Sequence, residues 1–447
     1  MRINRLIAPK QIFSKTRHTL ICGLSGYGKG NFGEFYVAQF VGKEKVFDLH
    51  SESRGEGMYY SLPQINSTLM HKIKYYSNNI LERYNDPELP NSKQIKNEII
   101  MLRGKVLAKF PKLPKNIKVT VFNEEWLSNE DLKKFLAFND AQSGFLDTIF
   151  EIFEDRHIKL SFLYNFLMKA KDQKSKEYKV IKQMGAHYMI INTVKRRART
   201  LLRSGIFFNS LEEDKKALWS SSSKDKEQKY FHFLNLEDSL KDINSITSFS
   251  TYLIEDEYIK YVAESVLLKK FIELIETRQT GVPMLFYIRE MNDFYYQKTP
   301  EPYVLDVRES IEKILRKGRF LGSAKVTIVG DTQLLNDIPD AVFNSFNKFI
   351  CFRLPIKDSN LLLRKATIPL DYLYKLASCD VGQGMYVVNG GYEYPALFLP
   401  TLHMKAEPEF DVFTYLGSVY GYINYSESGY VTKIKEQSAI SQEELII

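Results

Sequence analysis

The sequence predicts an α/β protein, and three observations lead to this fold class. A short apolar strand, Leu20–Cys22, runs directly into a glycine-dense turn that ends at Gly28–Lys29. Two later apolar runs, 284–288 and 325–330, have the composition of buried strands, and each is followed by polar residues. Amphipathic segments with helical spacing separate these strands. Strands that alternate with helices favour a sheet covered by helices.

The turn between Thr19 and Asn31 has the features of a phosphate-binding loop. It follows a strand, precedes an amphipathic helix and matches the pattern Gly23-x-x-x-x-Gly28-Lys29. Its backbone N–H groups would converge on an anion at the positive end of the helix, and the lysine would contact the β- and γ-phosphates. The alternative is a glycine-rich turn that binds no ligand. We expect ATP to bind here, at Gly23, Ser25, Gly26, Tyr27, Gly28, Lys29, Gly30 and Asn31.

Composition sets broad limits. The chain has 447 residues, which at about 150 residues per domain corresponds to two or three domains. With 44% hydrophobic and 26% charged residues, it resembles an ordinary globular protein. No apolar run approaches the roughly 20 residues of a membrane span, and the N-terminus lacks a signal-peptide pattern, so we expect a cytoplasmic protein. The net charge of +8 permits a polyanionic partner without requiring one.

The order of elements predicts an interrupted core. A strand at 44–49 follows the loop helix, helices are expected at 65–83 and 93–110, and a strand at 117–122. From a helix start at Ser128 to about Phe207 the pattern is largely helical, and a polar linker follows at 220–228. We therefore divide the chain into a first part of the core (1–64), a mostly helical insertion (65–227), a second part of the core (228–405) and a C-terminal extension (406–447).

A basic cluster lies on one helix of this insertion. It consists of Lys195, Arg196, Arg197, Arg199 and Arg203. On a helical period Arg196, Arg199 and Arg203 share one face. This face suits contact with a nucleic-acid backbone, but a solvated helix face explains it equally well, since no aromatic residue is interleaved with the arginines.

An acidic residue follows the strand at 284–288. Open α/β sheets bind ligands at the carboxyl ends of their strands, and we expect this strand beside the loop strand. Glu290 would then orient or deprotonate the water that attacks the γ-phosphate. Phosphate-loop enzymes usually have an Asp before this Glu, where this chain has Arg289. The alternative is that Glu290 is an ordinary surface residue.

A third block of residues completes a recognisable order. It comprises Arg316-Lys317-Gly318-Arg319, the strand at 325–330, Thr332-Gln333, Ile338-Pro339, Asn347, Phe352-Arg353 and a closing hairpin that begins at Gly382-Gln383-Gly384. With the glycine loop and Glu290, this order resembles the HerA/FtsK superfamily of ring-forming ATPases, which includes the coupling proteins of conjugation. The resemblance covers roughly residues 15–55 and 228–403.

The resemblance implies a RecA-like phosphate-loop core with a large helical insertion between the loop and the strand that precedes Glu290. It also implies ATP and Mg²⁺ as cofactors, Gln333 as a sensor of the γ-phosphate, and Arg316 or Arg319 as an arginine finger in a neighbouring subunit. The assembly would be a hexameric ring that moves double-stranded DNA. Lys29, Glu290 and Gln333 should then meet around one triphosphate.

Two departures from the family pattern concern the metal. Gly30 replaces the hydroxyl that normally holds Mg²⁺, and Arg289 replaces the acidic residue near it; Asn31, Asp48 or Asp293 would have to substitute. Our first hypothesis is a DNA translocase that packages, processes or transfers the DNA of a virus or mobile element, with a membrane or capsid protein as a further partner. The second is a nucleotide-binding assembly or scaffold protein that does not translocate. A small-molecule kinase is a weaker third.

Overall fold

The computed structural model describes residues 18–50, 96–102, 117–208 except 155, 231–295 except 252, 253, 255, 279 and 280, 301–317, 325–397 except 389, and the pairs 424–425 and 431–432. Among these residues, no helix is both long and apolar enough to span a bilayer. The predicted helix at 65–83 and the predicted linker at 220–228 lie outside the described residues.

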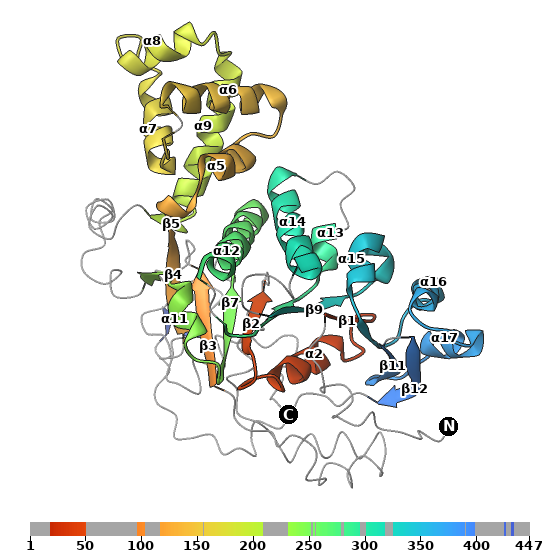
Figure 1. The fold of residues 1–447 in the computed structure, drawn as a ribbon. Helices are drawn as coiled ribbons and strands as arrows, with labels where there is room; N and C mark the ends of the chain where they lie inside the picture. Colours follow the sequence, from red (N-terminus) through yellow and green to blue (C-terminus); the bar gives the residue numbers. More distant parts are fainter. Residues whose placement is uncertain are drawn as a thin grey trace.

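A large sheet dominates the structure, and its strands follow the order β12-β11-β10-β1-β9-β8-β2-β7-β3-β4-β5, with β6 also paired to β4 (Figure 1). From β10 to β5 the pairing is parallel, and β11 and β12 add antiparallel strands at one edge. The predicted α/β fold is therefore confirmed. The strands are β1 (Thr19–Cys22), β2 (Lys45–His50), β3 (Lys96–Leu102), β4 (Ile117–Asn123), β5 (Phe207–Phe208), β6 (Phe231–Phe233), β7 (Ser245–Ser250), β8 (Met284–Ile288), β9 (Val326–Thr332), β10 (Lys348–Cys351), β11 (Gln383–Val388) and β12 (Gly391–Leu397).

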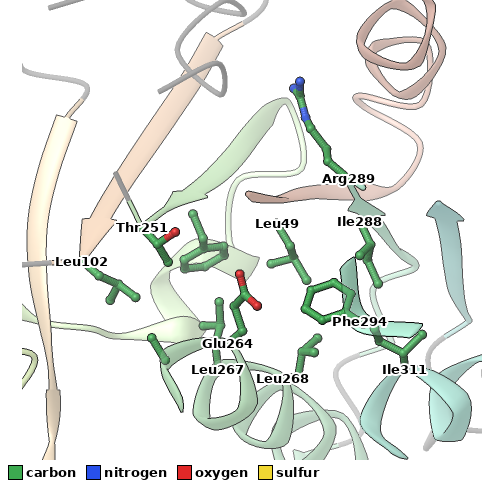
Figure 2. Close-up of a pocket in the computed structure, with 12 residues that line it drawn as sticks. Leu49, Leu102, Thr251, Glu264, Leu267, Leu268, Ile288, Arg289, Phe294 and Ile311 are labelled. Carbon is green, nitrogen blue, oxygen red and sulfur yellow. The ribbon is translucent and has the colours of Figure 1, made fainter. Parts of the chain in front are cut away.

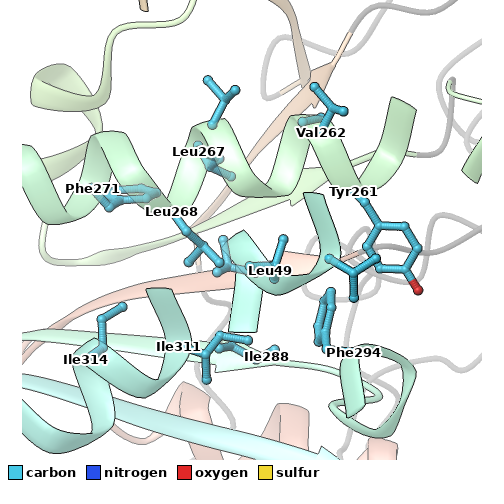
Figure 3. Packing of buried hydrophobic residues seen from close by; sticks show 14 of the residues in the cluster. Leu49, Tyr261, Val262, Leu267, Leu268, Phe271, Ile288, Phe294, Ile311 and Ile314 are labelled. Carbon is cyan, nitrogen blue, oxygen red and sulfur yellow. The ribbon is translucent and has the colours of Figure 1, made fainter. Parts of the chain in front are cut away.

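Helices cover both faces of this sheet. On one face α2 (Lys29–Ala38) packs its aromatic residues against alternate residues of the central strands, such as Ile21 and Leu285. On the other face α12 (Glu257–Arg278) and α14 (Pro302–Lys317) bury residues such as Phe271 and Ile311, as Figure 3 shows. Burial on both faces explains why a strand such as β8 is a continuous apolar run.

Two predictions about the sheet are corrected, and one strand was not predicted. The helix expected at 93–110 is wrong over residues 96–102, which form β3 between β7 and β4. A run of four apolar residues, 99–102, cannot distinguish a helix from a strand without its neighbours. The polar strand β7 was not predicted, although it is completely buried. Finally, β9 lies between β1 and β8, so the strand that precedes Glu290 is one position farther from the loop strand than expected.

The described helices of the stretch between β4 and β5 stand together at that end of the sheet (Figure 1). Ser128 caps the first of them, and Asp131 completes the capping box, as its sequence predicts. Because β3 and β4 belong to the main sheet, the described α-helices within 65–227 begin only at Asn129, after a single 3-10 turn at Glu124–Trp126. These helices are α5 (Asn129–Leu136), α6 (Asp140–Ile152), α7 (Leu160–Lys169), α8 (Lys176–Gln183) and α9 (Tyr188–Arg203).

Short helices complete the fold around the strand ends. Those nearest the site are α13 (Asn292–Tyr295) and α15 (Asp340–Ser345), and beyond β10 follow α16 (Ile356–Ser359) and α17 (Leu370–Leu376). A further short helix, α11 (Leu236–Leu240), precedes β7. The small hairpin β13 (Asn424–Tyr425) with β14 (Val431–Thr432) is the described part of the predicted C-terminal extension.

Candidate nucleotide-binding site

The glycine loop is held between the ends of β9 and β10. Gly23 N–H donates to Thr332 O (3.2 Å), and Leu24 N–H donates to Arg353 O (2.9 Å). A Cβ at Gly23 would lie 2.6 Å from Phe352 Cβ, so this close approach requires glycine. Gly28, at the start of α2, has φ of 95°, which side chains rarely adopt. The sequence therefore selects glycine where the loop turns into the helix.

Lys29 begins α2 and points toward the ends of β8 and β9. Its Nζ lies 3.1 Å from Glu290 Oε1 and 3.2 Å from Asp331 Oδ1, and the residue is only 6% exposed. Burial favours the neutral amine, but the charges of Asp331 and Glu290 outweigh it, so the pKa of Lys29 is raised above its usual value. The ammonium is thus charged and held between two carboxylates.

Asp331 is a site residue that sequence reasoning missed. Its Oδ1 also accepts a hydrogen bond from the backbone N–H of Glu290 (2.7 Å), and its Oδ2 accepts one from the Tyr287 hydroxyl (2.7 Å). Burial tends to raise the pKa of this carboxyl, but Lys29 and these donors hold it below its usual value. An acid two residues before Gln333, at the end of a predicted strand, was the available signal.

Glu290 connects Lys29 to Gln333. Its Oε1 contacts Lys29, while its Oε2 accepts a hydrogen bond from Gln333 Nε2 (3.3 Å). Glu290 has φ of 46°, which is uncommon for a residue with a Cβ and concentrates at functional sites. The hydrogen bonds from the N–H groups of Glu290 and Met291 to Asp331 hold this turn. Lys29, Glu290 and Gln333 are therefore brought together through Glu290, and Asp331 contacts both Lys29 and Glu290.

Arg289 points away from this cluster. Its guanidinium makes two contacts with the carboxylate of Asp48 (2.8 and 3.2 Å) and one with Glu34 (2.9 Å), all in a buried environment. It therefore ties α2 to the ends of β2 and β8. Because both oxygens of Asp48 contact Arg289, Asp48 does not fit the role of a substitute metal ligand.

The donors around Lys29 fit a hard cation such as Mg²⁺, which prefers oxygen and binds through one or two carboxylates together with phosphate and water. Asp293, at the start of α13, belongs to the same acidic neighbourhood: burial and then the charge of Glu290 raise its pKa to about 6. Among the described residues no group of three His, Cys, Asp or Glu side chains is arranged to hold an ion alone. Both oxygens of Asp331 are already engaged, so Glu290 and Asp293 would hold Mg²⁺, and only jointly with the nucleotide.

The other predicted site residues are placed as follows. Ser25 and Gly26 are exposed at the tip of the loop, and the Tyr27 hydroxyl accepts a hydrogen bond from Arg353 (2.5 Å). Arg316, at the end of α14, is exposed and pairs with Glu312 rather than with the cluster. Arg319 lies outside the described residues, and so does the side chain of Asn31. The arginine finger remains a prediction.

An apolar pocket lies behind the site on the α12 face. Figure 2 shows Glu264 of α12 pointing into it between Leu49, Thr251 and Phe294. Within the described part of the chain, Glu264 Oε2 has no hydrogen-bond partner, and burial raises the pKa of this carboxyl to about 8. A cavity volume of about 20 Å³ has room for roughly one water molecule, so we do not assign a ligand to it.

No protein-family model and no curated protein matches the sequence. Similar solved structures include VirB4 of Thermoanaerobacter pseudethanolicus (9% identity, 88% of this chain and 90% of that chain, TM-score 0.46). They also include the bacterial conjugative coupling protein TrwB in an unbound form (12%, 88% and 87%, TM-score 0.46) and with a non-hydrolysable GTP analogue (11%, 92% and 92%, TM-score 0.44). Such identities and TM-scores carry no argument about activity, for which the site itself must serve.

Proposed function

We propose that this protein binds and hydrolyses ATP. The observation that supports this most is the convergence of Lys29, Glu290 and Gln333, which come from three separate parts of the sequence, at the carboxyl ends of neighbouring strands beside a glycine loop. A glycine-rich turn without a ligand has no need of a buried lysine flanked by two carboxylates. Open α/β sheets bind their ligands at this edge.

Each residue has a distinct role in this proposal. Lys29 moves from the carboxylates to the β- and γ-phosphates when the triphosphate enters, because the phosphates offer it more negative charge. Glu290, released by that movement, accepts a proton from the attacking water or orients it. The Gln333 amide, which donates a hydrogen bond to Glu290 in the structure, senses whether the γ-phosphate is present. Bound Mg²⁺ would neutralise charge on the phosphates.

The finer proposal is that hydrolysis moves double-stranded DNA through a hexameric ring, for packaging, processing or transfer. The family resemblance of the 316–353 block supports it, together with the basic charge of the chain. In a ring, Arg316 or Arg319 of one subunit would complete the site of its neighbour, which agrees with the exposure of Arg316.

Hydrolysis by the purified protein, measured with Mg²⁺ or Mn²⁺ in the presence and absence of duplex DNA, tests both levels. We expect turnover that duplex DNA stimulates and that Lys29→Ala and Glu290→Gln abolish. If DNA does not affect turnover, the proposal that the protein is an ATPase stands and the proposal that it is a DNA translocase fails. If neither metal supports turnover, the enzyme proposal fails.

The second candidate is a nucleotide-binding assembly protein without turnover. The absence at Gly30 of the hydroxyl that normally holds Mg²⁺ favours it. It predicts saturable ATP binding and intact oligomers, with neither property changed by Glu290→Gln. Equilibrium binding of a fluorescent ATP analogue, measured beside the hydrolysis assay, separates the two candidates.

A further inference from the structure

Positive charge is strongly segregated within the chain. Residues 156–203, which include α7, α8 and α9, contain 13 Lys or Arg and two Asp or Glu, a net charge of +11. The whole chain carries +8, so the rest of the protein is net acidic. In Figure 1 these helices stand at the β5 end of the sheet, apart from the glycine loop. A field of one sign on a separate helical unit indicates an interaction surface for an anion.

Helix α9 presents an ordered part of this charge. Arg196, Arg199 and Arg203 are all exposed and share one face, and the opposite face is buried. The exposed side chain of Tyr188 (66%) begins the same face, about two to four turns before the arginines. No aromatic residue is interleaved with the arginines, as the sequence indicates, but Tyr188 precedes them on the same face. We call Tyr188, Arg196, Arg199 and Arg203 the α9 arginine face.

The three arginines of this face have no ion-pair partner within the described part of the chain. The neighbouring Arg197 shows what a structural arginine does here: it stacks on the Phe138 ring (3.4 Å) and donates to Leu136 O and Gln142 Oε1. Beside the face, Lys195 lies close to Lys171, and burial followed by this like charge lowers the pKa of Lys195 to about 8. Crowded cations without carboxylates favour binding of an external anion.

We propose that the α9 arginine face binds the sugar–phosphate backbone of DNA. The seven residue steps from Arg196 to Arg203 rise about 10.5 Å along the helix, which matches roughly three nucleotide steps of 3.4 Å along one strand. Guanidinium groups bind phosphate oxygens bidentately, and an exposed tyrosine supplies a surface for a base or sugar. The choice of DNA over an acidic protein rests on the function proposed above.

Fluorescence anisotropy with labelled 20-nucleotide DNA, duplex in one arm and single-stranded in the other, tests this on the full chain without nucleotide. The test variant is Arg196→Gln/Arg199→Gln/Arg203→Gln. The control variant, Lys357→Gln/Arg364→Gln/Lys375→Gln, removes the same charge from exposed positions at the opposite end of the sheet. We expect the test variant to bind roughly tenfold to several hundredfold more weakly at 0.1 M salt. Its salt slope should fall by about 2.7 for duplex DNA or about 2.1 for single strands.

Wild-type affinity and salt slope in the test variant would overturn the proposal, as would an equal loss in the control variant. Selective binding of polyglutamate with no binding of either DNA would instead indicate an acidic protein partner, which also overturns it. Thermal unfolding of both variants checks that they are folded. ATP hydrolysis without DNA should be unchanged in the test variant. If Lys29→Ala leaves hydrolysis intact while the arginine variant loses DNA binding, the nucleotide proposal fails and the DNA surface stands.

Discussion

The ion pairs of Lys29 give the sharpest test of the site geometry, because they predict a stability effect without any ligand. We consider Lys29→Met, which keeps the aliphatic stem and removes the charge, and Asp331→Asn, which keeps the shape and removes the other charge. Two unit charges 3.2 Å apart interact by about 5 kcal/mol at an effective dielectric of about 20. Desolvation offsets much of this. Removing one partner of a buried pair nevertheless costs about 3–5 kcal/mol.

We therefore expect Lys29→Met to lower the free energy of unfolding by about 3–5 kcal/mol at pH 7, since it leaves two carboxylates close together and buries Asp331 without a cation. Asp331→Asn should lower the free energy of unfolding by less than Lys29→Met does, because Lys29 keeps its ion pair with Glu290. In the double variant the uncompensated Asp331 charge is gone, so its loss should be smaller than the sum of the single losses by roughly 2 kcal/mol. Urea unfolding of the full chain without nucleotide measures the free energy of unfolding of all four proteins in this double-mutant cycle: the wild type, the two single variants and the double variant.

The pH dependence supplies an independent check. The pKa of Asp331 lies below its unfolded value, so its contribution to stability is present above about pH 4 and is lost as the pH falls through the folded pKa. Without Lys29, the largest opposing influence on this carboxyl is gone and burial raises its pKa relative to the wild type, so the deficit of Lys29→Met should shrink as the pH falls from 7 toward 5. Strict additivity of the two changes at pH 7, with no shrinkage in acid, would refute the geometry.

Three further changes probe neighbouring features. A Cβ at Gly30 would meet no atom within 4 Å, so Gly30→Ala should stabilise α2 by roughly 0.5 kcal/mol. A Cβ at Gly33 would lie 2.1 Å from the Tyr287 hydroxyl, so Gly33→Ala should lower the melting temperature. Equal melting temperatures for the two variants would contradict this contact. Glu290→Gly should be about 1 kcal/mol more stable than Glu290→Ala, because only alanine retains the cost of positive φ, and urea unfolding that ranks alanine first would exclude strain. Glu264 has a pKa raised to about 8, so wild-type stability should fall as the pH rises from about 4 toward 8. Glu264→Gln should flatten this slope in urea unfolding at pH 5 and 8, and an unchanged slope would show that another group causes it.

How far the sequence predicts the site depends on whether the signal is local. The glycine pattern identifies Lys29 within a stretch of eight residues. The strands before Glu290 and Gln333 are apolar enough to be recognised from their own sequence. Their meeting follows from the parallel order of the strands. Asp331 was missed because its role depends on β9 lying between β1 and β8, which no local pattern specifies.

The errors in the sheet have the same origin. The strand β7 has the sequence Ser-Ile-Thr-Ser-Phe-Ser, whose polar residues are buried only because β2 and β3 pair on either side of it. Strand propensity mainly reflects such packing, so a polar central strand leaves little trace in the sequence. For β3 the neighbours β7 and β4 likewise decide between strand and helix.

Arg289 and Asp331 together change how the departures from the family pattern should be interpreted. An arginine at the end of β8 would suggest a site that has lost an acidic group and gained a competing cation. The structure turns this guanidinium toward Asp48 and Glu34, and the neighbouring strand β9 supplies a buried carboxylate in contact with Lys29. Two carboxylates therefore still flank the lysine, as many as an Asp–Glu pair on β8 would provide. Loss of the acid at position 289 is thus a poor reason to expect an inactive site, and the missing hydroxyl at Gly30 becomes the single departure that hydrolysis measurements have to weigh.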